Sequence, residues 1–164
     1  MMRIAGLNDL DAVLDIVAKT IEVMRTENNL QWTEEYPALS HFISDVDEKS
    51  LYVYEKDGEV IGFICVNQKE EPAYAGLTWS QDPPCFVMHR MAVMPSARRE
   101  GVGRKLIAFA ENYAKERGVC YLRTDTFSKN TGMNILFKKC GFKKTGEVHF
   151  RGLPEPFNCY DKIL

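Results

Sequence analysis

The sequence has few cysteines, and they follow none of the patterns in which cysteines bind metals or build disulfide frameworks. Among its 164 residues there are five cysteines. That number is odd, and no Cys-x-x-Cys pair occurs. The spacing therefore argues against a disulfide-stapled fold and against a metal site, and we expect no bound metal. Unpaired cysteines suit a reducing compartment, so the sequence favours the cytoplasm.

Long apolar runs are also absent. No segment provides the roughly 20 consecutive apolar residues that cross a bilayer, and the N-terminal stretch lacks the apolar core of a signal peptide. We therefore expect neither membrane insertion nor secretion. An excess of charge of one sign is missing too, because the formal net charge is −2. Such a balance gives no overall attraction to nucleic acid or to an anionic membrane.

Length and composition predict one folded domain spanning residues 1–164. Hydrophobic residues make up 45% of the chain and charged residues 27%, which is ordinary for a globular protein. A chain of this length buries a substantial core. No repeat, linker or low-complexity segment divides it, so we expect no domain boundary.

Periodicity and turn signals predict helices and strands around one sheet. Helices are expected over residues 10–28, 37–47, 102–118 and 130–139. Strands are expected over residues 2–5, 51–54, 60–66, 86–93, 119–124, 142–148 and 157–163. Asp57 and Gly58 favour a tight hairpin turn between two of these strands. The long irregular stretch 68–84 is of a length that is usually functional or mobile.

The most informative segment is the turn between the strand at 86–93 and the helix that follows. It reads Arg98-Arg99-Glu100-Gly101-Val102-Gly103-Arg104. Two glycines let the backbone turn tightly, and the helix start presents unpaired N–H groups and the positive end of its dipole. Together with the arginines, this order favours a phosphate or pyrophosphate ligand. An ordinary strand–turn–helix with solvated arginines is the alternative.

This turn resembles the acyl-coenzyme A loop of the GNAT superfamily of N-acetyltransferases. That loop has Gln or Arg, two free positions, Gly, one free position, then Gly or Ala. Arg98, Gly101 and Gly103 fill its fixed positions. The predicted elements follow the order of the GNAT fold, and the resemblance is firmest over residues 86–142. It implies an α/β (α+β) fold with a single mixed, mostly antiparallel sheet of about six or seven strands, flanked by about four helices.

The resemblance implies an acyltransferase, specifically an N-acetyltransferase that uses acetyl-CoA. An acetyl group would pass to a primary amine of an unidentified small-molecule or peptide acceptor, directly and through a tetrahedral intermediate. In this family the strand before the glycine turn pairs with the pantetheine arm of the cofactor. The Met91 N–H would then hold the thioester oxygen, as backbone N–H groups do in oxyanion holes, and Val93 would pair with pantetheine. The cofactor-binding residues implied here are Met91, Ala92, Val93, Arg98, Arg99, Glu100, Gly101, Val102, Gly103 and Arg104.

His89 is the candidate general base. Its unperturbed pKa of about 6.5 suits proton transfer near neutral pH, and some members of the family use a His or Glu on this strand. His89 precedes Met91 by two positions, so both side chains leave the same face of the sheet if the strand is regular. Arg90 would then face the other way and form a structural ion pair. The alternative for His89 is a hydrogen-bonded core histidine, or a partner of a loop acid.

Asn130 and Phe137 belong to a second segment that resembles the family. Asn130, Phe137 and Gly141-Phe142 match an Asn…Tyr…Gly-Phe pattern in which the Asn binds the cofactor, so Asn130 is implied as a cofactor ligand. A helix N-cap is its other interpretation. The pattern departs at Phe137, because the usual Tyr protonates the departing sulfur and Phe carries no donor. A non-catalytic acyl-CoA-binding module is therefore the alternative function. A plain nucleotide-binding protein is less favoured, since no P-loop or GxGxxG occurs.

The acceptor side is less specified by the sequence. Three aromatic residues are candidates to line a pocket, with ordinary packing as the alternative: Trp32, Tyr36 and Trp79. Five acids are candidates to attract a cationic amine, with a solvated loop as the alternative: Glu34, Glu35, Glu70, Glu71 and Asp82. The oligomeric state is open, and a homodimer paired through the strand at 157–163 is one arrangement.

Overall fold

A seven-stranded sheet organises the chain, and the computed structural model describes all of residues 1–164. Its strands are β1 (Met2–Ile4), β2 (Leu51–Lys56), β3 (Glu59–Asn67), β4 (Phe86–Val93), β5 (Tyr121–Phe127), β6 (Lys143–Val148) and β7 (Phe157–Ile163). They lie in the order β1-β2-β3-β4-β5-β7-β6. Only β4 and β5 run parallel, so the predicted mixed, mostly antiparallel sheet is confirmed.

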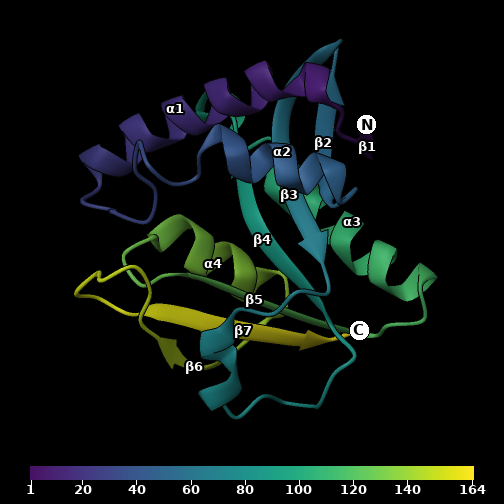
Figure 1. Cartoon of the computed structure of the whole chain (residues 1–164), viewed down its shortest axis with the longest axis vertical. Coiled ribbons are helices and arrows are strands. Elements are labelled where there is room, and N and C mark those ends of the chain that lie inside the picture. The colour runs from purple at the N-terminus through teal and green to yellow at the C-terminus, as the bar shows by residue number, and fades with distance from the viewer.

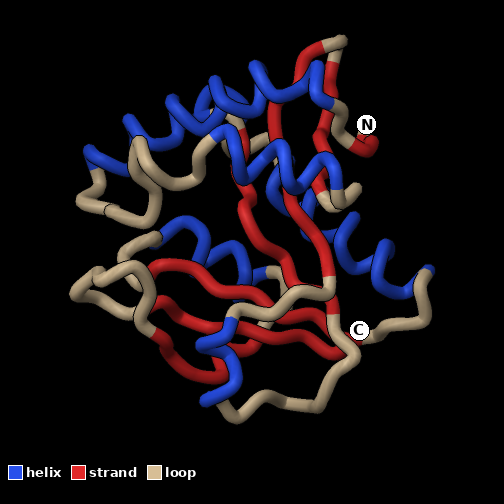
Figure 2. The backbone as a smooth tube through the Cα atoms, in the orientation of Figure 1, coloured by secondary structure: helices blue, strands red, loops and turns tan.

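Four α-helices and three short 3-10 turns complete the fold (Figures 1 and 2). The helices are α1 (Leu10–Thr26), α2 (Leu39–Asp47), α3 (Val102–Glu116) and α4 (Thr131–Lys139), and the turns are η1 (Leu7–Asp9), η2 (Pro72–Gly76) and η3 (Pro95–Ala97). None of the helices combines the length and the apolar character that crossing a bilayer requires. The number of helices agrees with the prediction, and most boundaries shift by only a few residues.

The two faces of the sheet carry separate apolar clusters. Along β3, Ile64 and Val66 pack with the buried face of α3, whereas Phe63 and Cys65 pack with α1 and α2. This alternation is what a strand buried on both faces requires, since successive side chains point to opposite sides. Figure 1 shows α1 and α2 lying together across the half of the sheet that contains β2 and β3. Helices therefore cover both faces of β3, and α1 and α3 each contact β4 as well.

The sheet opens between β4 and β5. These strands pair only from Phe86 to Met88, opposite Leu122 to Thr124. At the last paired position the Thr124 hydroxyl donates to the Met88 carbonyl oxygen over 2.9 Å. Beyond it the strands separate, as Figure 2 shows. The second half of β4 is therefore an open strand edge in the middle of the fold.

The last strand is interior rather than available to a second subunit. β7 pairs with β5 on one side and with β6 on the other, over nearly its whole length. The homodimer pairing through residues 157–163 that the sequence left open is therefore excluded, because both edges of that strand are already hydrogen-bonded within the chain. The order of the last two strands, in which β7 inserts between β5 and β6, places the free sheet edge at β6.

The irregular stretch 68–84 is tied to the sheet. The Arg123 guanidinium on β5 pairs with Glu70 and donates to the Gln81 carbonyl oxygen over 2.8 Å. Asp161 on β7 accepts from both the main chain and the hydroxyl of Ser80. These buried anchors hold the stretch against β5 and β7 at its two ends. They position the segment between them, which contains η2, beside the open part of the sheet.

Candidate active site

Two adjoining cavities lie where β4 leaves β5. The larger cavity, of about 730 Å³, extends along the start of α3 and the outer side of α4. The smaller cavity, of about 350 Å³, is enclosed by the α1–α2 connection, β4, β5 and the β6–β7 connection. Four residues line both: Met24, Met91, Asn130 and Met133. The cavities therefore meet beside the middle of β4.

The glycine turn forms one end of the larger cavity. Arg99 and Gly101 both have left-handed backbone conformations, with φ of 72° and 78°. Left-handed residues in such a turn gather N–H groups into an anion-binding concavity, and α3 begins directly afterwards at Val102. Gly103 also lines this cavity. Two left-handed residues and the start of α3 thus lie together at this end of the larger cavity.

Basic side chains surround this end of the larger cavity. Arg98, Arg99 and Arg104 line it together with Lys139 from α4, and none of the four makes a hydrogen bond or an ion pair within the chain. Glu100 differs, because its carboxylate accepts from Lys56 over 2.8 Å and does not line the cavity. Only its main-chain N–H is thus left for the predicted cofactor role. The cavity end therefore carries unneutralised positive charge.

The open edge of β4 lines the larger cavity through residues 91–93. Met94 N–H donates to the Ile61 carbonyl oxygen over 2.8 Å, and the register continues with Val93 opposite Gly62 and Met91 opposite Ile64. Main-chain groups alternate along an antiparallel strand, so those of Met91 and Val93 point away from β3. On that side β5 has separated. Met91 and Val93 therefore present free main-chain groups to an extended ligand.

A bulge in β4 overturns one expectation about His89. Met91 pairs with Ile64 and Met88 pairs with Val66, so β4 has one residue more than β3 over this interval. An extra residue breaks the alternation of side chains. His89 contacts Asn67 and Arg90 contacts Asp45, on the α2 side of the sheet, while Met91 packs on the opposite face. The predicted shared face of His89 and Met91 is wrong, and so is the opposition of His89 and Arg90.

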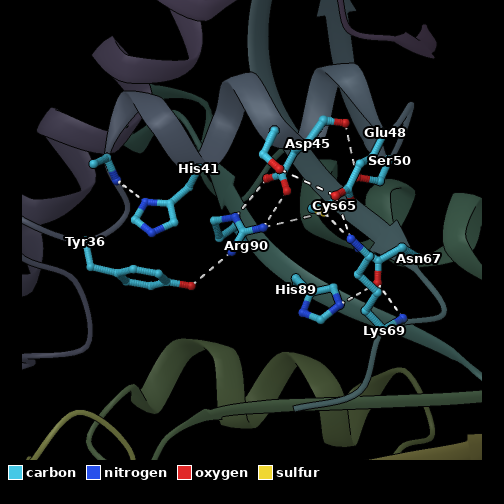
Figure 3. A network of polar contacts seen from close by, with 12 residues as sticks. Tyr36, His41, Asp45, Glu48, Ser50, Cys65, Asn67, Lys69, His89 and Arg90 are labelled. Atoms are coloured by element: carbon cyan, nitrogen blue, oxygen red, sulfur yellow. Dashed lines mark hydrogen bonds and ion pairs between the residues drawn. The ribbon is translucent and has the colours of Figure 1, made fainter. Parts of the chain in front are cut away.

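Arg90 forms the predicted structural ion pair. Its Nε and Nη2 donate to the two carboxylate oxygens of Asp45 on α2, over 2.9 and 2.6 Å, and Nη1 donates to the Tyr36 hydroxyl over 3.2 Å (Figure 3). The side chains are only 14% and 6% exposed. This buried, bidentate ion pair holds the bulge against α2, and the hydrogen bond to the hydroxyl positions the ring of Tyr36.

His89 is a neutral imidazole with a defined tautomer. Its Nε2 lies 2.8 Å from the Asn67 Oδ1, which also accepts the main-chain N–H of Lys69 over 2.9 Å (Figure 3). Because that oxygen is an acceptor, Nε2 carries the proton and Nδ1 keeps its lone pair. Burial, reinforced by the positive charge of Arg90, lowers the pKa of His89 to about 4. The expected pKa near 6.5 is therefore wrong, and at neutral pH His89 is an unprotonated but weak base. Nδ1 lies 3.9 Å from the Glu71 carboxylate, and the residue lines the smaller cavity.

The smaller cavity has apolar walls and three further charged groups. Its hydrophobic lining consists of Met24, Trp32, Tyr36, Met88, Met91, Met133, Phe137, Phe150 and Phe157. Glu71, Asp125 and Arg151 also line it. Of the predicted aromatic residues, Trp32 and Tyr36 are in place, but Trp79 packs on Tyr74 instead. Of the predicted acids, only Glu71 lies in the cavity.

Sequence reasoning missed Asp125 and Arg151. The predicted strand ends at residue 124 and Asp125 is not among the predicted site residues, whereas β5 continues to Phe127. A charged residue between Thr124 and the apolar Phe127 is the signal that was available. Arg151 precedes Gly152 in the β6–β7 connection, and nothing in the sequence connects that turn with the cavity.

Asn130 lies at the boundary of the two cavities. Its Oδ1 accepts from the Met133 N–H over 3.2 Å, which makes it the N-cap of α4, and its Nδ2 donates to Gln31 over 2.7 Å. Phe137, on the same helix, is buried against Tyr160 and Phe142 and forms part of the smaller cavity. The helix thus supplies an amide at the boundary but no hydroxyl at position 137.

Comparisons with known proteins agree with this architecture. The profile of the acetyltransferase (GNAT) family matches residues 17–142. An uncharacterized N-acetyltransferase, YhfO of Bacillus subtilis (strain 168), is 25% identical over 150 residues, covering 91% of this chain and 94% of the relative. The aminoglycoside N(6')-acetyltransferase type 1 of Klebsiella aerogenes is 31% identical over 100 residues, covering 60% of this chain and 61% of the relative. A GNAT-family acetyltransferase structure from Streptococcus agalactiae 2603 shares the fold, with a TM-score of 0.87 and 22% identity over 100% of this chain and 95% of that one.

Proposed function

The chain belongs to the acetyltransferase (GNAT) family and is an acyltransferase, and from this premise we propose that it moves an acetyl group from acetyl-CoA to a primary amine. One observation carries the proposal. The two cavities meet at the open edge of β4, so that a long ligand in the larger one and a small ligand in the smaller one reach the same main-chain groups. That arrangement suits a reaction in which two substrates react directly.

The larger cavity fits coenzyme A by its chemistry. Unpaired Arg98, Arg99, Arg104 and Lys139 suit the phosphates, and the left-handed turn before α3 suits a pyrophosphate. The free edge of β4 suits the amide groups of pantetheine, which hydrogen-bond as a neighbouring strand does. Asn130 stands where the two cavities join and would bind the same arm. In this assignment acetyl-CoA supplies the activated acetyl group.

Different residues at the junction of the two cavities would then carry out different parts of the reaction. The Met91 N–H holds the carbonyl oxygen as negative charge develops on it. An acceptor that binds as an ammonium first releases one proton to solvent to become the neutral amine. The lone pair of His89 Nδ1 accepts the second proton as the nitrogen attacks, directly or through a water molecule. The amine nitrogen bonds to the acetyl carbon to give a tetrahedral intermediate. When this intermediate collapses, the carbon–sulfur bond breaks and the sulfur leaves with the electron pair. Because Phe137 carries no proton, the sulfur departs as a thiolate, without a proton from this position.

A matched pair of charge reversals tests the binding half. Arg104→Glu places a carboxylate among the cationic groups of the larger cavity, whereas Lys105→Glu makes the same change one residue along, outside it. We expect Arg104→Glu to weaken coenzyme A binding at least about tenfold in calorimetry, and Lys105→Glu to leave it within about twofold. Equal affinities for the two variants, or no binding by the unaltered protein, would contradict the assignment.

A second pair of variants tests the proposed role of His89 in catalysis. His89→Gln removes the lone pair of Nδ1, and we expect kcat for amine-dependent thiol release to fall about 100-fold while coenzyme A affinity is retained. His41→Gln is the control, because His41 caps the start of α2 and does not line either cavity. Unchanged kcat in His89→Gln would remove His89 from the mechanism and leave the binding half standing.

A further inference from the structure

Arg151 is an unpartnered cation at the smaller cavity. Its guanidinium lies over the ring of Tyr36, 4.4 Å from the ring centre, and 5.5 Å from that of Phe157. It makes no ion pair and no hydrogen bond within the chain, although it lines the cavity. Arg151 is exposed at the rim of the cavity, so water meets its five N–H donors when no ligand is bound. A carboxylate that enters the cavity would find these donors free to pair with it.

The backbone conformation at Arg151 supports this. Arg151 and Gly152 both have positive φ, 52° and 65°, and Leu153 N–H donates to the Phe150 carbonyl oxygen over 3.1 Å. Such a turn prefers Asn, Asp or Gly at its first central position, where a longer side chain is strained by about 1–2 kcal/mol. No polar atom of the chain pairs with the Arg151 guanidinium, so no hydrogen bond or ion pair within the chain offsets this strain. Strained positions of this kind gather at binding sites.

Two carboxylates, those of Asp125 and Glu71, line the same cavity as Arg151. One oxygen of Asp125 accepts from the Tyr74 hydroxyl, and the other makes no hydrogen bond within the chain. Burial raises the pKa of Asp125 to about 6, with Glu71 adding to the effect. Glu71 in turn lies beside His89 Nδ1. An ammonium group placed between Asp125 and Glu71 would therefore satisfy both carboxylates and stand next to the base.

Arg151 and the two carboxylates interact electrostatically but form no ion pair. Arg151 stabilises the charged form of Asp125 through space, yet no nitrogen of Arg151 comes within 4.0 Å of either carboxylate. Groups of opposite charge that face one small cavity without pairing suit a molecule that carries both charges itself. The rest of the lining is apolar and aromatic, which suits a hydrophobic side chain.

We propose that the acceptor is an α-amino acid with an apolar or aromatic side chain, its carboxylate held by Arg151 and its amino group held between Asp125 and Glu71. This rests on the proposed acetyl transfer and names the substrate class of that site. Arg151 disfavours a polycation such as an aminoglycoside through like-charge repulsion. The amino terminus of a peptide has no carboxylate beside it, so Arg151 would stay without a partner. The second cation of the cavity, Arg90, is already neutralised by Asp45.

The test compares amines that differ only in the carboxylate. Thiol release from acetyl-CoA is measured with L-methionine and L-phenylalanine, and with 3-(methylthio)propylamine and 2-phenylethylamine, which lack the carboxylate. We expect kcat/KM to be at least about tenfold higher for the amino acids, because the decarboxylated amines offer no carboxylate to pair with the Arg151 guanidinium. In Arg151→Gln we expect the KM of the amino acids to rise at least about tenfold and kinetics with the decarboxylated amines to change less than about twofold.

Arg117→Gln is the matched control, since Arg117 also stacks on a tyrosine ring, 3.5 Å from the centre of Tyr113, but lies at the end of α3 outside the cavity. It should alter neither class. A readout besides activity is calorimetry of L-phenylalanine with the unaltered protein saturated with coenzyme A, where we expect binding that Arg151→Gln loses.

The outcomes separate this inference from the function beneath it. Equal or faster reaction of the decarboxylated amines, or an equal effect of Arg151→Gln on both classes, overturns carboxylate recognition and leaves acetyl transfer standing. Coenzyme A binding without acetylation of either amino acid also overturns it. Absence of coenzyme A binding together with absence of any thiol release removes the proposed function, and this inference with it.

Discussion

The buried ionisable groups at the cavity junction show how environment sets the role of a residue. His89 and Asp125 both lie in a poorly solvated site, and burial favours the neutral form of each. The pKa of the histidine therefore falls to about 4 and that of the aspartic acid rises to about 6. At neutral pH His89 offers a lone pair, while Asp125 is a carboxylate that loses its charge in mildly acidic solution.

A pH dependence follows for acceptor binding. Because the pKa of Asp125 is raised, its neutral form persists up to about pH 6, and a neutral acid holds an ammonium group less well. We expect the KM of L-methionine to be constant from pH 7.5 to about 6.5 and to rise below pH 6, reaching about tenfold at pH 5. The amino group stays protonated throughout this range. The other ionisable groups around Asp125 are Tyr74, Glu71, Arg151 and Cys159.

Steady-state kinetics between pH 5 and 7.5 measure this, with the KM of acetyl-CoA as the internal reference. In Asp125→Asn the KM of the amino acid should be high already at pH 7, and the inflection near pH 6 should disappear. An acceptor KM that stays flat in the unaltered protein would show that Asp125 does not hold the amino group.

At this scale the sequence predicted the residues that belong to motifs and missed those that a motif does not mark. His89, Met91 and Asn130 were reached by resemblance and line the cavities. Arg151 was out of reach, because it meets Tyr36 across more than a hundred residues of sequence. The hydrogen bond that defines the tautomer of His89 was equally hidden, since Asn67 lies on a different strand.

At the scale of elements, small irregularities position the site. The glycine pattern was expected to let a cofactor approach the backbone, and Gly103 does line the larger cavity. A Cβ at this position would also lie 2.9 Å from the Cδ2 of Leu136 on α4. The glycine therefore lets two helices approach as well. A substitution there disturbs packing together with binding, which is why Arg104 and Lys105 are the better pair for testing the cofactor site.

The bulge in β4 could not be read from the sequence either. Phe86–Val93 looks like a regular buried strand and was located to the residue. What shifts His89 and Arg90 to one side is pairing with β3, which has one residue fewer over the same interval. Register is a property of two strands together, so an apolar pattern within one strand does not reveal a bulge.

The ion pair that fastens this bulge yields a stability prediction. Asp45→Ala leaves the Arg90 guanidinium buried with only the Tyr36 hydroxyl as a hydrogen-bonding oxygen, and removing one partner of a buried pair costs about 3 kcal/mol. We expect denaturant unfolding to show a loss of that size. Asp15→Ala is the control, because the Lys19–Asp15 pair on α1 is about half exposed and its loss costs about 0.5 kcal/mol or less. Similar losses in both variants would show that the Arg90–Asp45 pair contributes little.

At the scale of the whole molecule, the site exists because β4 and β5 pair over only three residues and then separate. The order of helices and strands was predictable from periodicity, and its likeness to a known fold predicted a mixed sheet. The gap between β4 and β5 depends on which strands pair and for how long, and β7 inserting between β5 and β6 depends on contacts far apart in sequence. The cavities, and the charged groups that face each other across them, follow from that separation.

A ligand bound in the larger cavity, which β4, α3 and α4 line together, should stabilise the entire fold. Coenzyme A in the larger cavity would contact β4, α3 and α4 together, because all three elements line that cavity. Because ligand that binds only the folded state adds RT ln(1 + [L]/Kd), a hundredfold excess over Kd adds about 2.7 kcal/mol. For a chain of this size the Tm should rise by about 5–10 °C. Thermal unfolding with and without coenzyme A measures the shift, which should persist in Lys105→Glu and shrink in Arg104→Glu. A Tm that does not respond to millimolar coenzyme A would contradict binding of coenzyme A by the folded chain.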